Sequence, residues 1–407
     1  MRRVAAPFGS LPVACRLFGL LLLVLATVDG ARAEARGEIA AAEPSAADLM
    51  LFRAAQVDDP EMAEFALDRG ASIAIRDPHG RTALLFAAES NSPKVVARLL
   101  RHGARPDEAT SDDGWTGLHY AAYQGWLAVA DLLIAAKAPL EARESDHGNT
   151  PLLLAARRGK AVIVARLIRA GAQVDVRDLS DGNTPMIDGA FSADPVAVLS
   201  ELLVAGADPT LAATDGVTPL IAAADHGSAD ATGLLLSNGA VLEARTKSGE
   251  TALLRAASQG HLDVLELLAK AGADLEVRDE RGLTPLTTAL RNADRPMVER
   301  LLALGADPKA PGPEGRTPVI VAARGGEAAL LALLLKAGAP ADSADDRGNT
   351  ALMYAANVGF AQGVELLLGA GADPSRVARD GWTAIQAAEM IGADDIVARL
   401  RAAGAKK

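Results

Sequence analysis

One nine-residue phrase, Gly148-Asn-Thr-Pro-Leu-Leu-Leu-Ala-Ala156, is repeated along most of the chain and constrains the fold more than any other feature. Its opening Gly-x-Thr recurs ten times, at steps of 34 residues four times and then of 33 residues five times. A fixed period of this length indicates an array of one supersecondary unit, because each copy needs its neighbours to bury its apolar face. The phrase begins at Gly80, Gly114, Gly148, Gly182, Gly216, Gly249, Gly282, Gly315, Gly348 and Gly381.

The residues of the phrase predict what each unit contains. Thr150 suits a helix N-cap and Pro151 the first helical position, where a missing N–H costs nothing. The small alanines that follow let a second helix pack closely behind the first. That second helix is predicted over 161–170 and ends at Gly171, and an Asp-Gly pair further on is typical of a hairpin. One repeat is therefore predicted to be helix, turn, helix and hairpin.

These features are similar to the ankyrin repeat: the T-P-L-x-x-A-A run, the glycine between the helices and the terminal Gly-Ala-Asp. The resemblance covers residues 77–407. It implies an all-α solenoid of stacked repeats in a curved superhelix, with helices on the concave side and hairpin tips at the edge. The family's usual histidine after T-P-L occurs only at His119, so inter-repeat hydrogen bonding at this slot is in question. The other repeats hold Leu85, Leu153, Ile187, Ile221, Leu254, Thr287, Ile320, Met353 and Gln386.

The chain outside the repeats suggests export and capping. Residues 1–33 combine a basic start, a 12-residue apolar run and Ala31-Arg-Ala33, a pattern typical of a cleaved secretory signal; an uncleaved anchor is the alternative. Residues 34–45 are predicted to be a linker and 46–76 an N-terminal capping repeat. Residues 77–407 then hold ten repeats, of which the last is a C-terminal cap.

Composition limits the classes of partner. Cys15 is the only cysteine and lies in the predicted signal, so the mature chain has no disulfide or thiolate chemistry. Removal of residues 1–33 takes the formal charge from −11 to −14, which disfavours nucleic acid and anionic membranes as partners. We expect an exported monomer that is free of the membrane after signal cleavage, in the periplasm first and outside the cell second.

Binding residues are predicted in repeats two to four, where the few aromatic residues gather. Exposed Trp, Tyr and Arg are enriched at binding hot spots. The alternative is that Tyr120 and Trp126 pack internally while Trp115 and Tyr123 have no specific role. The predicted protein-binding patch, called the Trp115 patch below, consists of Trp115, Tyr123, Gln124, Arg157, Arg158, Phe191, Asp112, Asp146, His147 and Asn183.

Catalytic motifs are absent from the sequence. There is no Gly-x-Ser-x-Gly, no phosphate-binding glycine loop and no His-Glu-x-x-His, and the six histidines lie in separate repeats. We therefore expect no cofactor, no metal and no enzymatic activity. The interpretation is a non-catalytic protein-binding scaffold of the cell envelope; a secreted effector that binds a host protein is the alternative, and an enzyme or metal-dependent protein a remote one.

Two smaller expectations concern the tips and the turns. Arginines that precede the tips are predicted to form a ladder of hydrogen bonds and ion pairs along the hairpin edge: Arg76, Arg143, Arg177, Arg245 and Arg278. Lys137 stands where every other repeat has the glycine of Gly-Ala, which predicts a strained left-handed residue.

Overall fold

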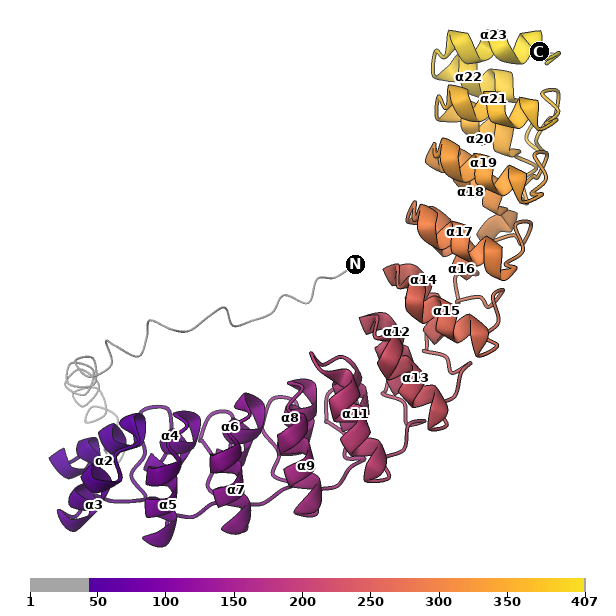
Figure 1. The fold of residues 1–407 in the computed structure, drawn as a ribbon. Helices are drawn as coiled ribbons and strands as arrows, with labels where there is room; N and C mark the ends of the chain where they lie inside the picture. Colours follow the sequence, from indigo (N-terminus) through magenta and orange to yellow (C-terminus); the bar gives the residue numbers. More distant parts are fainter. Residues whose placement is uncertain (1–43, 406–407) are drawn as a thin grey trace. The chain divides into compact units, whose positions relative to one another are not determined.

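The computed structural model describes residues 44–405, so the predicted signal and almost all of the predicted linker lie outside the described residues. The chain divides into two compact units, one ending at Arg105 and the other beginning at Pro106. Within each unit, helices follow one another in pairs joined by loops (Figure 1). None of the described helices is long and apolar enough to span a membrane.

The described part of the first unit, from residue 44 onward, contains four helices. They are α2 (Ala46–Val57), α3 (Pro60–Asp68), α4 (Ala83–Glu89) and α5 (Pro93–Arg101). Ser45 caps α2 in a capping box with Asp48, and the Asp48 carboxylate also accepts the Ser72 N–H at 2.7 Å. Asp58 accepts the N–H groups of Lys94 and Val95 at the start of α5, so a carboxylate of one helix pair caps a helix of the next.

The second unit stacks nine helix pairs in chain order. The first helices of the pairs contact one another along the stack, as do the second helices. The first helices are α6 (Gly117–Gln124), α8 (Pro151–Arg157), α10 (Pro185–Ala190), α12 (Pro219–His226), α14 (Ala252–Gln259), α16 (Pro285–Arg291), α18 (Pro318–Gly325), α20 (Ala351–Asn357) and α22 (Ala384–Met390). The second helices are α7 (Leu127–Ala135), α9 (Ala161–Arg169), α11 (Pro195–Val204), α13 (Ala229–Ser237), α15 (Leu262–Lys270), α17 (Arg295–Leu304), α19 (Ala328–Lys336), α21 (Ala361–Gly369) and α23 (Asp394–Ala402).

The repeated phrase acts as its residues predict. The Thr150 hydroxyl accepts the Leu153 N–H at 3.4 Å, and Pro151 is the first residue of α8. Leu152, Leu153 and the two alanines of the phrase are at most 1% exposed. Alanine at the packed positions lets neighbouring helices approach closely, and this small-residue core continues through the stack.

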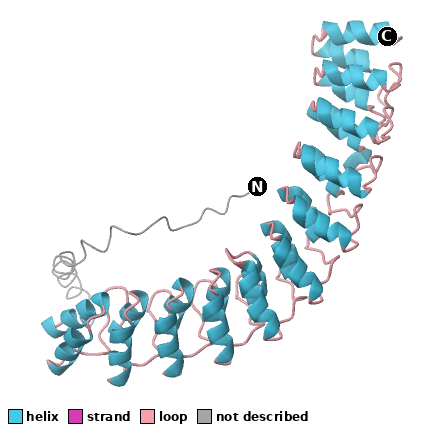
Figure 2. Ribbon diagram, viewed as in Figure 1, coloured by secondary structure: helices cyan, strands magenta, loops and turns pink. Residues whose placement is uncertain are grey.

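The hairpin expectation is only partly met. In residues 44–405 no extended strand forms, and the tips contribute four single bridges, such as Ala344 with Thr350 (Figure 2). The reason lies in where the backbone groups bond. At seven of the eight joints between neighbouring tips of the second unit, a tip N–H donates to a carbonyl of the preceding tip at 2.7–3.0 Å, as in Ser145 to Asp113 and Leu179 to His147. Backbone hydrogen bonds therefore run from one tip to the next, and few backbone groups remain to pair in a hairpin within one repeat.

The predicted arginine ladder forms, but its acceptors are backbone carbonyls. Arg143 donates to the Gly148 carbonyl at 2.6 Å and to the Arg177 carbonyl of the next repeat at 2.8 Å. Arg177, Arg245 and Arg278 repeat the pattern. The expected ion pairs do not form at these four arginines within the described chain. One guanidinium has enough donors to join its own tip to the following one.

His119 makes the inter-repeat bond that the other residues at its slot lack. Its Nδ1 accepts the Thr116 N–H at 3.0 Å, and its Nε2 lies 3.1 Å from the Asn149 carbonyl of the next repeat. Burial lowers the pKa of His119, so the neutral ring donates this bond. At the same slot Thr287 and Gln386 bond only within their own repeats. The sequence-based doubt about this slot is therefore justified.

Lys137 adopts the predicted left-handed conformation, with φ of 62°. We expect Lys137→Gly to raise the free energy of unfolding by about 0.5–1 kcal/mol, because glycine enters this region without a Cβ penalty. Urea unfolding of the two proteins measures the difference. Lys336→Gly, inside the last turn of α19, is the control and should lower stability by about 1 kcal/mol. A destabilised Lys137→Gly protein would contradict the assignment of strain to this residue.

Candidate protein-binding site

The Trp115 patch lies within the second unit, at the ends of three first helices and at the tips beside them. Tyr123 and Gln124 are the last residues of α6, Arg157 is the last residue of α8, and Phe191 is the C-cap of α10. Because α6 contacts α8 and α8 contacts α10, these ends belong to neighbouring repeats. The tips contribute the remaining polar members and Trp115.

Trp115 connects a tip to a helix end. Its ring centroid lies 5.0 Å from that of Tyr120 and 5.5 Å from that of Tyr123, and 6.0 Å from the His119 ring. The Arg158 guanidinium of the next repeat sits over the Tyr123 ring at 4.5 Å. Ring contacts at these separations stabilise a fixed geometry, and the arginine adds a cation–π contact. Trp115 is half-buried and therefore also packs the repeat, as does the half-buried Trp126.

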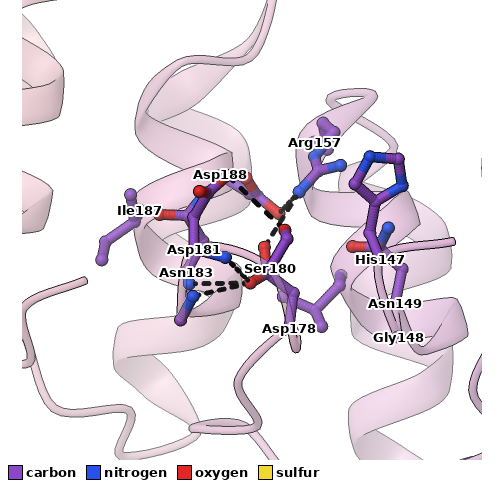
Figure 3. Close-up of polar contacts among 12 residues, drawn as sticks. His147, Gly148, Asn149, Arg157, Asp178, Ser180, Asp181, Asn183, Ile187 and Asp188 are labelled. Carbon is purple, nitrogen blue, oxygen red and sulfur yellow. Dashed lines mark hydrogen bonds and ion pairs between the residues drawn. The ribbon is translucent and has the colours of Figure 1, made fainter. Parts of the chain in front are cut away.

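Arg157 is held by two buried carboxylates. Its Nη2 lies 3.0 Å from an Asp188 carboxylate oxygen and 3.4 Å from one of Asp178 (Figure 3). The Asp178 side chain is fully buried and that of Asp188 is 7% exposed, whereas Arg157 keeps 37% exposure. Arg157 thus joins its own repeat to the next repeat from one helix end. Its removal would leave two buried carboxylates without their cation, which makes it a structural residue of the patch.

Burial raises the pKa of Asp188 to about 6, although the charge of Arg157 acts in the opposite direction. Asp178 and Asp181 contribute to the increase through like-charge repulsion. The carboxyl group of Asp188, which contacts the patch residue Arg157, therefore changes charge as the pH passes through about 6. The positive potential at Arg157 is larger when Asp188 is protonated.

Two acidic residues fold the tips that carry the polar members of the patch. Asp178 accepts the N–H groups of Asp181, Gly182 and Asn183 at 2.7–3.3 Å. Glu144 plays the same part in the preceding tip for Asp146, His147 and Asn149. Burial would raise the pKa of Glu144, but these N–H donors hold it below its usual value. Glu144 and Asp178 thereby fix the backbone of the tips from which the exposed polar side chains project.

Several predicted residues come together and others do not. Tyr123 contacts both Trp115 and Arg158, and Arg157 precedes Arg158 in the chain. His147, 57% exposed, and Asp146 project from one tip. Gln124 makes no side-chain hydrogen bond among the described residues, and Asp112 accepts only the adjacent Asp113 N–H. Phe191 is 44% exposed and contributes apolar surface at the edge.

Sequence reasoning missed Asp188, Asp178 and Glu144. A signal existed for Asp188: it stands four residues after Thr184, where the other repeats have Phe, Tyr, Leu, Ala, Arg, Thr or Val. An acid at this inner position requires a cation nearby, and Arg157 occupies the adjacent repeat. Asp178 and Glu144 carry no such signal, because acidic residues are common in turns.

Comparison with known families decides the class of the chain. A model of ankyrin repeats in three copies matches residues 51–144, 190–279, 286–378 and 330–407, and a single ankyrin-repeat model matches 147–179. Together these matches cover most of the sequence. The chain belongs to the ankyrin-repeat family. Its fold is an all-α repeat solenoid, and ankyrin repeats generally bind other proteins and are typically non-catalytic.

One curated relative shares a short stretch with this ankyrin-repeat chain. It is the ADP-ribosylation factor GTPase-activating protein AGD4 of Arabidopsis thaliana, 42% identical over 65 residues. The match covers 16% of this chain and 8% of the plant protein. A stretch of that size is about two ankyrin repeats, so the likeness concerns the repeat and not the plant protein's activity.

One group in the ankyrin tips has the geometry of metal ligands. The ligand atoms of Glu144, Asp146 and His147 lie within 4.8 Å of one another, which is found for no other such trio in residues 44–405. Both oxygens of Glu144, however, already accept hydrogen bonds, from Asp146 on one side and from His147 and Asn149 on the other. We assign the group to the structure of the turn.

The raised pKa of Asp188 predicts a pH dependence of stability. The folded value of about 6 exceeds the unfolded value of 3.8, so folding favours the protonated carboxyl group. This contribution is present in full below pH 4 and is lost as the pH rises through 6. The stability of the parent protein relative to Asp188→Asn should therefore fall by roughly 2–3 kcal/mol between pH 4 and 7. Chemical denaturation of both proteins at several pH values measures this difference, and parallel curves would contradict it.

Proposed function

We propose that this chain is an exported, non-catalytic scaffold of the cell envelope that binds another protein through the Trp115 patch. The observation that carries the proposal is the continuous contact from Trp115 through Tyr123 to Arg158, which joins a tip and two helix ends. Aromatic and arginine side chains held in this way lose little conformational freedom on binding. They also belong to the residue types that dominate binding energy at interfaces.

The size and charge of the patch support a protein partner. A standard interface covers roughly 800 Å² on each partner, and three neighbouring repeats supply a surface of that scale. Asp112, Asp146 and His147 surround the aromatic centre with polar groups, as the rim of an interface does. The acidic net charge of −11 disfavours nucleic acid as an occupant.

The proposed location rests on residues 1–33, whose sequence pattern is that of a cleaved signal. We propose the periplasm as the site of action and a monomer as the active form. Fractionation of the source cells tests the location: recovery of the mature protein in the periplasmic fraction supports it. Recovery in the medium would favour a released effector that binds a host protein.

The binding test uses variants that leave the buried ion pairs intact. We expect Tyr123→Ser combined with Arg158→Ala and Phe191→Ser to weaken partner binding at least about tenfold, because these are aromatic and arginine side chains of the patch that are partly exposed. Cross-linked capture from the envelope fraction, with the mature protein as bait, compares the triple variant with the parent. Arg157 is left unchanged because it neutralises Asp178 and Asp188.

The matched control removes the same kinds of side chain elsewhere. Met390→Ser with Arg169→Ala and Val204→Ser removes two exposed apolar side chains and one exposed arginine outside the patch. The control should retain the partner. A partner recovered equally with all three baits would place the binding surface elsewhere in the array, and thermal unfolding of each bait confirms that the variants are folded.

A further inference from the structure

A hollow of about 380 Å³ lies between α16 and α18, in the seventh and eighth repeats counted from Gly80. This volume falls in the range of roughly 300–1,000 Å³ that small-ligand sites occupy. Its apolar lining comes from Leu283, Leu290 and Val321, together with Pro313 and the methyl-bearing Thr287. Its charged lining consists of three arginines, Arg291, Arg316 and Arg324. A hollow lined by apolar side chains and arginines differs in chemistry from the Trp115 patch, whose centre is aromatic.

The joint between the tips of these two repeats differs in sequence from the other joints of the second unit. At the seven neighbouring joints of the second unit, a tip N–H donates to the preceding tip carbonyl. At this joint the donor position is occupied by Pro313, which has no N–H. A Cβ placed on Gly282 would lie 3.9 Å from the Pro313 backbone nitrogen, whereas the corresponding distance to the donor nitrogen is 2.9–3.5 Å at six of the other seven joints. The two tips are therefore further apart here than elsewhere in the unit.

Two of these three arginines, Arg291 and Arg324, have no carboxylate partner among the described residues, whereas Arg316 pairs with Glu314. Arg291 and Arg324 occupy the same slot at the ends of α16 and α18, the slot that Tyr123 and Arg157 hold in the Trp115 patch. Both are exposed, and neither makes an ion pair or side-chain hydrogen bond among the described residues. Arg316 bonds to Glu314 through Nη2, yet its buried Nε has no hydrogen-bond partner in the described part of the chain.

We propose that this hollow, called the Pro313 pocket, is a second binding site that receives an acidic peptide segment, with an apolar side chain in the hollow and carboxylates on Arg291 and Arg324. The charge pattern argues for this occupant. Two unpaired arginines in successive repeats form a local positive surface on a chain of net charge −11, and planar guanidinium groups match carboxylates. The apolar lining adds a preference for a residue such as leucine beside the acidic ones.

Methyl NMR of the full chain tests the proposal, with leucine methyl groups labelled and those of Leu283 and Leu290 assigned by single Leu→Met variants. The probe is the blocked peptide Gly-Glu-Leu-Glu-Gly. We expect saturable shifts of these two residues' methyl signals. Replacement of both glutamates by glutamine should weaken binding at least about tenfold, and replacement by lysine should abolish it. Absence of saturable shifts, or equal binding of the lysine peptide, would overturn the proposal.

Two variants locate the site. Arg291→Gln with Arg324→Gln should weaken binding of the acidic peptide about tenfold or more, whereas Arg169→Gln with Arg376→Gln, which removes equal charge from exposed positions elsewhere, should not. Equal loss in both pairs would show non-specific attraction and refute the site. Glutamine retains the length of the side chain, and thermal unfolding verifies that both proteins are folded.

Pro313→Ala tests the origin of the pocket. Alanine restores the missing N–H, so the tip can donate to the preceding one and the joint should close. We expect the variant to bind the acidic peptide less tightly by about fivefold or more and to unfold at a higher temperature. Unchanged binding would show that the absence of this single hydrogen bond does not hold the pocket open. The Trp115 patch is remote in sequence from these substitutions, so its own test is unaffected by either result.

Discussion

The hydrogen bond between neighbouring tips is the interaction on which the second unit depends. Each interior repeat buries its apolar surface against the repeats on both sides, and the tip N–H and the ladder arginine help to place one repeat on the other. Where the donor is present, as at Leu179 and Thr214, neighbouring tips are close. Where proline replaces it, at Pro313, a hollow remains. The donor is one of the contacts that set the distance between neighbouring tips.

Both candidate sites use the same slot of the repeat for different chemistry. The residue at the end of the first helix is exposed or half-buried in every repeat, so the stack tolerates Tyr123, Arg157, Phe191, Arg291 or Arg324 there. Its neighbours determine its role. Arg157 is tied to Asp178 and Asp188 and supports the surface, whereas Arg291 and Arg324 have no acidic partner among the described residues. The same residue type at the same slot is structural in one repeat and available to a ligand in another.

Much of the fold was predictable because it follows from local chemistry. Thr150 caps, Pro151 starts a helix and Lys137 takes the left-handed conformation for reasons that involve only a few adjacent residues. The extent of the hairpins was not predictable in this way, because whether a tip bonds within itself or to its neighbour depends on repeat spacing. The aromatic cluster was visible in the sequence; the buried partners of Arg157 were not, since Asp178 resembles an ordinary turn residue.

The sequence by itself determined the repeat, its period, its helix N-caps and the class of the fold. A recurring pattern of N-cap residue, small residues and glycine folds into the same unit in every copy, and the copies stack. Only the tertiary structure decided which polar residues are buried together and which joint is open. Asp188 acquires its raised pKa, and the Pro313 pocket its volume, from contacts between residues about 30 positions apart. Those contacts depend on the distance between repeats, which is a property of the assembled stack and not of any one copy.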